Sequence, residues 1–319
     1  MSLQPKVSLL SSTERPIETI NAVWQASRDN EPVDLNNGDP DLFQKVIDSK
    51  IPVAEMIDFV FLLENVSIAF REQMVRHRIG VKVGDRLGVD HVPDLADSTW
   101  WSQSMRVLDM GSFASAKAYE TPEAVKNSKG AWVDDYNKHM QRTEELYNNL
   151  LSAGVPAEDA RMILPLACQH RIVWKLNLAA LMHIVSKRSC WILQLGFWGP
   201  VIRGMIQELA YGIDPIFARL ATPPCMRGDK FNECLFHLDN EKRMKGEDPL
   251  PPCPLWMNQH RDRSRAAEEA GAVWTLDTQG HASHLGDHAK NATYNSMVCT
   301  YNDFWYRDVR SGRPAHESV

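Results

Sequence analysis

The chain has 319 residues, of which 44% are hydrophobic, and a formal net charge of −6. This length fits one large domain or two small ones, with enough apolar residues for a substantial core. The acidic balance argues against a nucleic-acid-binding surface, although a local arginine cluster could still bind a free nucleotide. No segment approaches the roughly 18 apolar residues of a membrane helix, and the N-terminus lacks a secretory signal, so we expect a cytoplasmic protein with no membrane partner.

The first predicted elements are a buried strand and the helix that follows it. Residues 59–63 read Phe-Val-Phe-Leu-Leu, a run typical of a buried strand. Ser67 can cap a helix that continues through residues 73–78. Three side chains would then stand at i, i+3 and i+4 and share one helical face: Gln73, Arg76 and His77.

Two helices are predicted next. The spacing of apolar residues indicates a helix over 132–151, which Gly154 ends. A shorter helix bearing Arg161 is bracketed by Pro156 and Pro165.

We expect a longer helix over residues 166–188, with Asn177 and Arg188 three turns apart on one side. Short strands mixed with long amphipathic helices favour an α+β fold. No glycine-rich dinucleotide-binding or phosphate-binding loop is present, so a nucleotide would have to be held in another way.

Three donor-rich side chains are adjacent at Arg76-His77-Arg78. Arginine presents a permanently charged, planar group that matches phosphate, and histidine adds a donor or a titrating proton. The cluster therefore predicts an anion-binding segment, and a nucleotide fits that description.

Further motifs follow the cluster in order: Ser104-Met105-Arg106, the segment Arg161 to Pro165, Asn177, and Gln194. Together they resemble the flavin-dependent thymidylate synthases, whose signature is an Arg-His-Arg motif ending in Ser-x-Arg, followed by an Arg-x-x-Leu-Pro segment and an Asn-x-Arg helix. The resemblance covers residues 50–205 and implies an antiparallel sheet flanked by long helices. It also implies a homotetramer in which several subunits meet around each flavin.

The resemblance also assigns roles to single residues. The cofactor-binding residues would be Arg76, His77, Arg78, Asn177 and His183. The substrate-binding residues would be Gln73, Arg76, Ser104, Arg106, Arg161 and Arg188. The catalytic candidates are Arg161 and Arg188, because arginines near the phosphate and the base would offset the negative charge that develops on the pyrimidine. No metal is assigned to this site.

The reaction implied is reductive methylation at C5 of a pyrimidine nucleotide, with conversion of dUMP to dTMP as the default. FAD, NADPH and methylenetetrahydrofolate are the implied cofactors, and the protein would mainly orient them. Other interpretations stay open: action on UMP or a cytosine nucleotide, hydroxymethylation instead of methylation, or nucleotide binding without catalysis.

The sequence departs from the family pattern in several places. Residues 80–97 form an insertion inside the signature motif, and Trp100 and Trp101 follow it just before Ser104. These tryptophans could stack on a base, a pterin or the flavin, or could simply pack in the core. Ala179 stands where the family has its second flavin-helix arginine.

Beyond the catalytic region, predicted to span residues 1–211, lies a C-terminal extension, 212–319, expected to be helical or irregular. The six cysteines of the chain are too sparse for a disulfide scaffold. Two patterns in the extension could bind metal: Cys225, Cys234, His237 and Cys253 as a zinc site, and His281, His284 and His288. They motivate a rival interpretation, a metal-dependent nucleotide hydrolase.

Overall fold

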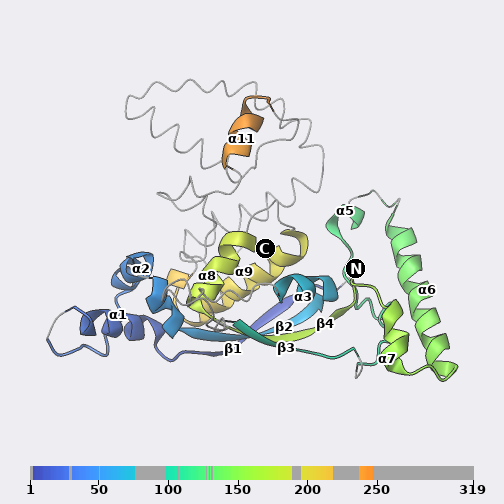
Figure 1. Ribbon diagram of the computed structural model, residues 1–319, viewed down its shortest axis with the longest axis horizontal. Helices are drawn as coiled ribbons and strands as arrows, with labels where there is room; N and C mark the ends of the chain where they lie inside the picture. Colours follow the sequence, from blue (N-terminus) through green and yellow to red (C-terminus); the bar gives the residue numbers. More distant parts are fainter. Residues whose placement is uncertain are drawn as a thin grey trace, which may run out of the picture. The chain divides into compact units, whose positions relative to one another are not determined.

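The computed structural model divides the chain into two compact units (Figure 1). The structure describes residues 3–28, 31–49, 51–75, 98–105, 108–126, 128, 130, 132–188, 195–217 and 237–247. The first unit comprises Met1–Ile184 and Phe197–Leu220, and the second comprises Val185–Gly196 and Ala221–Val319. The sheet and most of the described helices belong to the first unit.

A four-stranded antiparallel sheet forms the centre of the first unit. Its strands are β1 (Lys6–Ser12), β2 (Asp58–Ser67), β3 (Ser98–Ser102) and β4 (Gln169–Asn177), in the order β1-β2-β4-β3. The predicted buried strand over 59–63 is confirmed as the middle of β2. Helices with an antiparallel sheet confirm the predicted α+β class.

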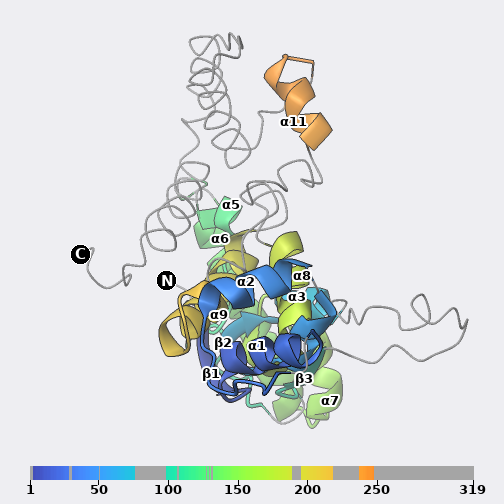
Figure 2. The ribbon, with the colours of Figure 1, turned by 90° about the vertical axis from the view of Figure 1, so that its left-hand side faces the viewer.

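Alternate residues of the two central strands form the core face of the sheet. Phe59, Phe61 and Leu63 of β2 have no exposed surface, and neither do Ile172, Trp174 and Leu176 of β4. Helix α3 (Ile68–Met74) and the parts of α8 (Leu178–Arg188) and α9 (Leu195–Gly212) in the first unit lie over this face (Figures 1 and 2). Because side chains alternate along a strand, the core face is continuous across the strand pair.

The prediction of one helix over residues 166–188 is wrong. The segment forms strand β4 and then helix α8. Burial alternates from Ile172 to Leu176, the pattern of a strand, and β-branched and aromatic residues at 172–174 suit that conformation. Strands on both sides satisfy the backbone of β4, so tertiary pairing decides its conformation.

The remaining elements are helical and follow one another along the chain as α1 (Pro16–Ala26), α2 (Pro40–Ser49), η1 (Ile51–Met56), α5 (Glu123–Lys126), α6 (Val133–Ser152), α7 (Ala157–Ala160), η2 (Arg161–Ile163) and α11 (His237–Met244). Helix α6 confirms the predicted helix over 132–151. Its Met140 and Tyr147 are buried, and Gly154 follows its end with a positive φ of 83°. That backbone conformation favours glycine and ends the helix.

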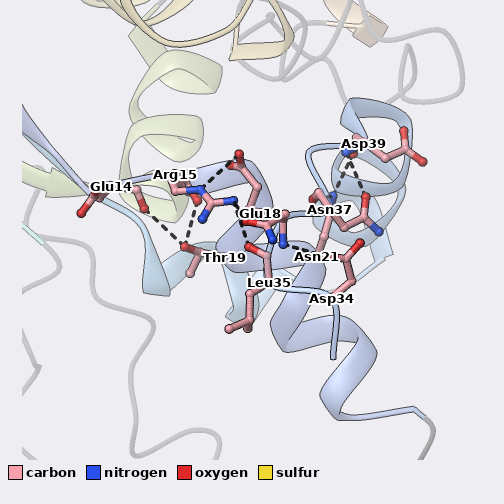
Figure 3. A network of polar contacts seen from close by, with 10 residues as sticks. Glu14, Arg15, Glu18, Thr19, Asn21, Asp34, Leu35, Asn37 and Asp39 are labelled. Carbon is pink, nitrogen blue, oxygen red and sulfur yellow. Dashed lines mark hydrogen bonds and ion pairs between the residues drawn. The ribbon is translucent and has the colours of Figure 1, made fainter. Parts of the chain in front are cut away.

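A buried asparagine fixes the connection between α1 and α2 (Figure 3). Asn21 is only 1% exposed, and its Nδ2 donates to the carbonyl oxygens of Asn37 and Asp39, both at 2.9 Å. Arg15 adds a bond from its guanidinium to the carbonyl oxygen of Leu35 at 3.0 Å. Side-chain bonds to backbone carbonyls thus hold residues 35–39 of this connection against α1.

Two glycines of α9 form a matched pair for testing how closely this helix packs on the sheet. A Cβ added at Gly204 would lie 2.6 Å from Cγ2 of Val7 on β1, whereas one at Gly212 would meet nothing within 4 Å. We expect Gly204→Ala to lower the free energy of unfolding by about 1–3 kcal/mol, because of overpacking. Gly212→Ala should leave it unchanged or raise it slightly. Denaturant unfolding of both variants measures the difference, and equal stabilities would contradict the close contact.

Candidate functional site

Helix α3 carries the first predicted site residue, Gln73. Its N-cap is Ser67, as predicted, whose buried Oγ accepts a hydrogen bond from the amide of Phe70 at 3.2 Å. The helix ends at Met74, short of the predicted end at residue 78. The cluster Arg76, His77 and Arg78 lies outside the described residues, so its shared face with Gln73 stays a prediction.

The side chain of Gln73 contacts helix α9. Its Oε1 accepts a hydrogen bond of 2.9 Å from Nε1 of Trp198, which has no exposed surface. The Trp198 ring also packs on Phe70, with ring centroids 4.4 Å apart, and meets Trp174 of β4 edge-on at 6.4 Å. The end of α3 is therefore fixed over the core face of the sheet by aromatic contacts.

A second hydrophobic cluster brings Ser104 and Arg161 into one region. Met105 and Ala160, the neighbours of these two residues in sequence, are both buried in a cluster that also contains Tyr147 of α6. Ser104 itself is exposed, and Arg161 is half-buried with its Nε donating to the carbonyl oxygen of Glu158 at 3.0 Å. The predicted partner Arg106 lies outside the described residues.

Asn177 lies at the other end of the sheet. It is the last residue of β4, and its Oδ1 accepts a hydrogen bond from the amide of Ala180 at 2.8 Å, which caps α8. Gln103 pairs with Arg171 near the start of β4. At roughly 3.3 Å per residue, Asn177 is therefore on the order of 20 Å along the strand from Ser104.

His183 and Arg188 both lie on α8 and are half-buried. Asn177 precedes this helix, so the predicted three-turn alignment of Asn177 with Arg188 does not exist. Within one chain, Ser104 and Arg161 come together, whereas Asn177 is separated from them.

The two tryptophans before Ser104 point to opposite faces of the sheet. Both are in β3, where Trp100 is opposite Trp174 and Trp101 is opposite Val173. Trp100 is half-buried on the core face, whereas Trp101 is 82% exposed. Adjacent strand residues cannot face one ligand together, so a stacking role could fall only to one of the two.

The motifs did not predict a buried histidine near the start of β4. His170 is 4% exposed, and neither ring nitrogen has a hydrogen-bond partner among the described residues. Burial, and to a smaller extent the nearby charge of Arg71, lower the pKa of His170 to about 4, although the backbone of Val66 acts in the opposite direction. His170 lies two residues before Ile172 in strand β4, and side chains two apart in a strand point to the same face. This spacing is the sequence signal that places His170 on the core face.

The one cysteine in the described part of the chain is buried and unreactive. Cys168 has no exposed surface, and burial raises the pKa of its thiol to about 12. The thiolate is the nucleophile, so this thiol cannot attack a substrate at neutral pH. Covalent catalysis by Cys168 is therefore excluded.

The described residues contain no group of three or more histidine, cysteine or acidic side chains that could bind a metal ion. The proposed zinc ligands Cys225, Cys234 and Cys253 lie outside the described residues, as do the side chain of His237 and the histidines at 281, 284 and 288. Among the helices that the structure describes, none is long and apolar enough to cross a membrane.

The family model for the thymidylate synthase complementing protein matches residues 8–194. The chain belongs to this family. The match includes the whole of β2, β3 and β4 with α3, η2 and α8, and its range includes the sequence positions of all the predicted site residues. Family membership was predicted from the motifs at 76–78, 104–106 and 161–165, and it is confirmed.

Relatives of the chain are named flavin-dependent thymidylate synthase. The one from Thermococcus onnurineus is 28% identical over 194 residues, which cover 58% of this chain and 71% of the relative. The one from Geobacter sulfurreducens is 30% identical over 182 residues, covering 55% and 66%. The crystal structure of Thymidylate Synthase X from Helicobacter pylori, with FAD and dUMP, is 15% identical and has a TM-score of 0.50. It covers 68% of this chain and 99% of that chain, and shows that the fold is shared.

His170 predicts an acid-sensitive step in stability. The pKa of His170 in the folded protein lies below the ordinary value of 6.5. Between these two pKa values the unfolded chain therefore binds a proton that the folded protein does not bind. As the pH falls from 6.5 to about 4, we expect the free energy of unfolding to drop by about 3 kcal/mol from this group. His170→Leu should remove this drop in urea unfolding across that range.

The control for His170 is His139→Gln on the solvent-exposed face of α6, which should keep the wild-type pH dependence. An unchanged slope in His170→Leu would show that His170 titrates normally in the folded protein.

Arg161 gives a prediction about ligand binding. The sequence motif predicts that Arg161 contacts the phosphate of a nucleotide. Charge-assisted contacts of this kind contribute about 1.5–3 kcal/mol each, so on that prediction Arg161→Ala should weaken the binding of a pyrimidine nucleotide by about one to two orders of magnitude. Isothermal titration calorimetry measures the affinity. Arg142→Ala, which removes an exposed arginine of α6, is the charge-matched control and should bind as the wild type does. Equal affinities for the two variants would argue against a role for Arg161.

Proposed function

We propose that the protein is a flavin-dependent thymidylate synthase that converts dUMP to dTMP by reductive methylation at C5. FAD, NADPH and methylenetetrahydrofolate are the proposed cofactors. The observation that carries the proposal is the family match over residues 8–194, a range of sequence that includes every predicted ligand-binding position.

The side chains present suit phosphate-bearing ligands. The candidate residues that the structure describes are two arginines, a serine hydroxyl, a histidine and two carboxamides: Arg161, Arg188, Ser104, His183, Gln73 and Asn177. None of them carries negative charge, and FAD and dUMP are both anionic. The Oδ1 of Asn177 already caps α8. Contact with FAD through this residue would use the second lone pair of Oδ1 or the Nδ2 donor.

Three of these residues have a proposed task in binding the nucleotide. Ser104 and Arg161, held in one region by the second hydrophobic cluster, bind the nucleotide phosphate. Arg188 lies near the base and offsets the negative charge that develops on the pyrimidine. Bound FAD supplies the reducing equivalents, and the chain's contribution is orientation and electrostatics.

The separation of the candidate residues supports the proposal of a homotetramer. Asn177, assigned to the flavin, and Ser104, assigned to the pyrimidine nucleotide, are on the order of 20 Å apart along β4, although the reaction needs the two ligands in contact. A site that uses both ends of the sheet is completed by residues from neighbouring chains. We also propose that residues 1–211 are the catalytic part, that 212–319 are an addition to it, and that the protein is cytoplasmic.

Purified protein tests the proposal directly. We expect it to copurify with FAD or bind it stoichiometrically, with the absorbance of oxidised flavin and a matching mass after denaturation. With NADPH and methylenetetrahydrofolate it should convert dUMP to dTMP, a product that mass spectrometry identifies. Parallel incubations with UMP, dCMP and CMP separate the default substrate from its alternatives.

Two outcomes would contradict the proposal. A folded sample that fails to bind FAD at high micromolar concentration is not a flavoenzyme. A flavin-loaded sample that binds dUMP without forming product would be a nucleotide-binding protein.

A further inference from the structure

Trp198 holds the carboxamide of Gln73 in one orientation. Its indole N–H donates to Oε1 of Gln73 at 2.9 Å, across 125 positions of sequence. Indole nitrogen is a donor and never an acceptor, so it pairs with the oxygen of a carboxamide and not with the NH₂ group. The Nε2 end of Gln73 must therefore face away from Trp198.

The indole ring itself has little freedom to turn. Trp198 is fully buried, with the Phe70 ring 4.4 Å from it and the Trp174 ring 6.4 Å from it. The Nε1 of Trp174 has a separate partner, the buried Oγ of Ser98 at 2.7 Å, so it does not compete with Trp198 for Gln73. Phe70 precedes Gln73 by one helical turn. The Trp198 ring can therefore pack on Phe70 and at the same time hydrogen-bond to Gln73.

A carboxamide on a helix surface can usually flip by 180° and act as donor or acceptor. At Gln73 a flip would place NH₂ against the indole N–H and leave a buried donor unpaired. The donor end is thus fixed at the next-to-last residue of α3, three positions before Arg76.

We propose that Trp198 is a positioning residue that presets Gln73 as a hydrogen-bond donor toward an acceptor oxygen of the nucleotide. This inference rests on the proposed function, since it takes Gln73 to contact the substrate. Preorganised donors bind more tightly than free ones because their orientation is fixed before the ligand arrives. Trp198 would act on affinity for the nucleotide through Gln73, without touching the ligand.

The test compares two tryptophan variants of the full-length, FAD-loaded protein. Trp198→Phe keeps an aromatic ring but removes the donor to Gln73, and Trp174→Phe removes the donor to Ser98 in the same aromatic group. Calorimetric titration with dUMP should show a Kd about tenfold higher for Trp198→Phe, equivalent to one lost hydrogen bond. Trp174→Phe should bind dUMP as the wild type does. At saturating dUMP, kcat of Trp198→Phe should stay near the wild-type value.

A double-mutant cycle shows whether Trp198 acts through Gln73. Gln73→Met removes the carboxamide, and adding Trp198→Phe to it should weaken dUMP binding no further. Losses that add, or wild-type affinity in Trp198→Phe, would overturn the inference.

Gln73→Glu keeps the proposal testable if the tryptophan variant folds poorly. A glutamate still accepts the indole hydrogen bond but offers an acceptor where Gln73 offers a donor. We expect dUMP affinity to fall by at least about tenfold, and wild-type affinity would overturn the donor role. The wild-type titration separates the two proposals: if it binds dUMP, failure of the variants affects the Trp198 inference alone, and if it does not, both proposals fall.

Discussion

The antiparallel pairing of β2 with β4 is the constraint on which the rest of the molecule depends. The pairing extends from Asp58 opposite Asn177 to Ser67 opposite Gln169, and it aligns the buried side chains of both strands on one face. That face supplies the apolar area on which the helices pack. The hydrophobic effect of burying it is the main stabilising contribution available to a single-layer sheet. A shift of the register by one residue would turn Trp174 and its core neighbours outward.

Each central strand leads directly into a capped helix. Ser67 ends β2 and caps α3, and Asn177 ends β4 and caps α8. Since the strands are antiparallel, the two helices begin at opposite ends of the sheet. The same pairing thus places the ends of the two strands, and with them Asn177 and the start of α3, at opposite ends of the sheet.

The sequence predicted those parts of the fold that depend on interactions between residues close together in the chain. The continuous apolar run at 59–63, the cap at Ser67 and the glycine stop at Gly154 all depend on neighbouring residues. Strand β4 was predicted as helix because its alternation is short and runs straight into the apolar helix α8. Its conformation is decided by two partner strands, which a single sequence does not identify.

The candidate site likewise has features that local sequence predicts and features that it does not. Residue type and order identify the candidate ligand residues, which stay predictions, whereas the Gln73–Trp198 contact and the burial of His170 depend on packing between elements far apart in sequence.

Cys168 also has a consequence for how the protein can be observed. Its carbonyl oxygen accepts the amide of Ile68 at the start of α3, and its backbone bridges to Tyr119. Thiol reagents react with the thiolate and must reach the sulfur. In the folded protein the thiol of Cys168 is buried and its pKa is raised, so neither condition is met. The labelling rate of Cys168 therefore measures how often the junction of β4, α3 and the Tyr119 segment opens. Labelling read at this one of the six cysteines therefore reports the kinetics of local unfolding beside Ile68 and Tyr119.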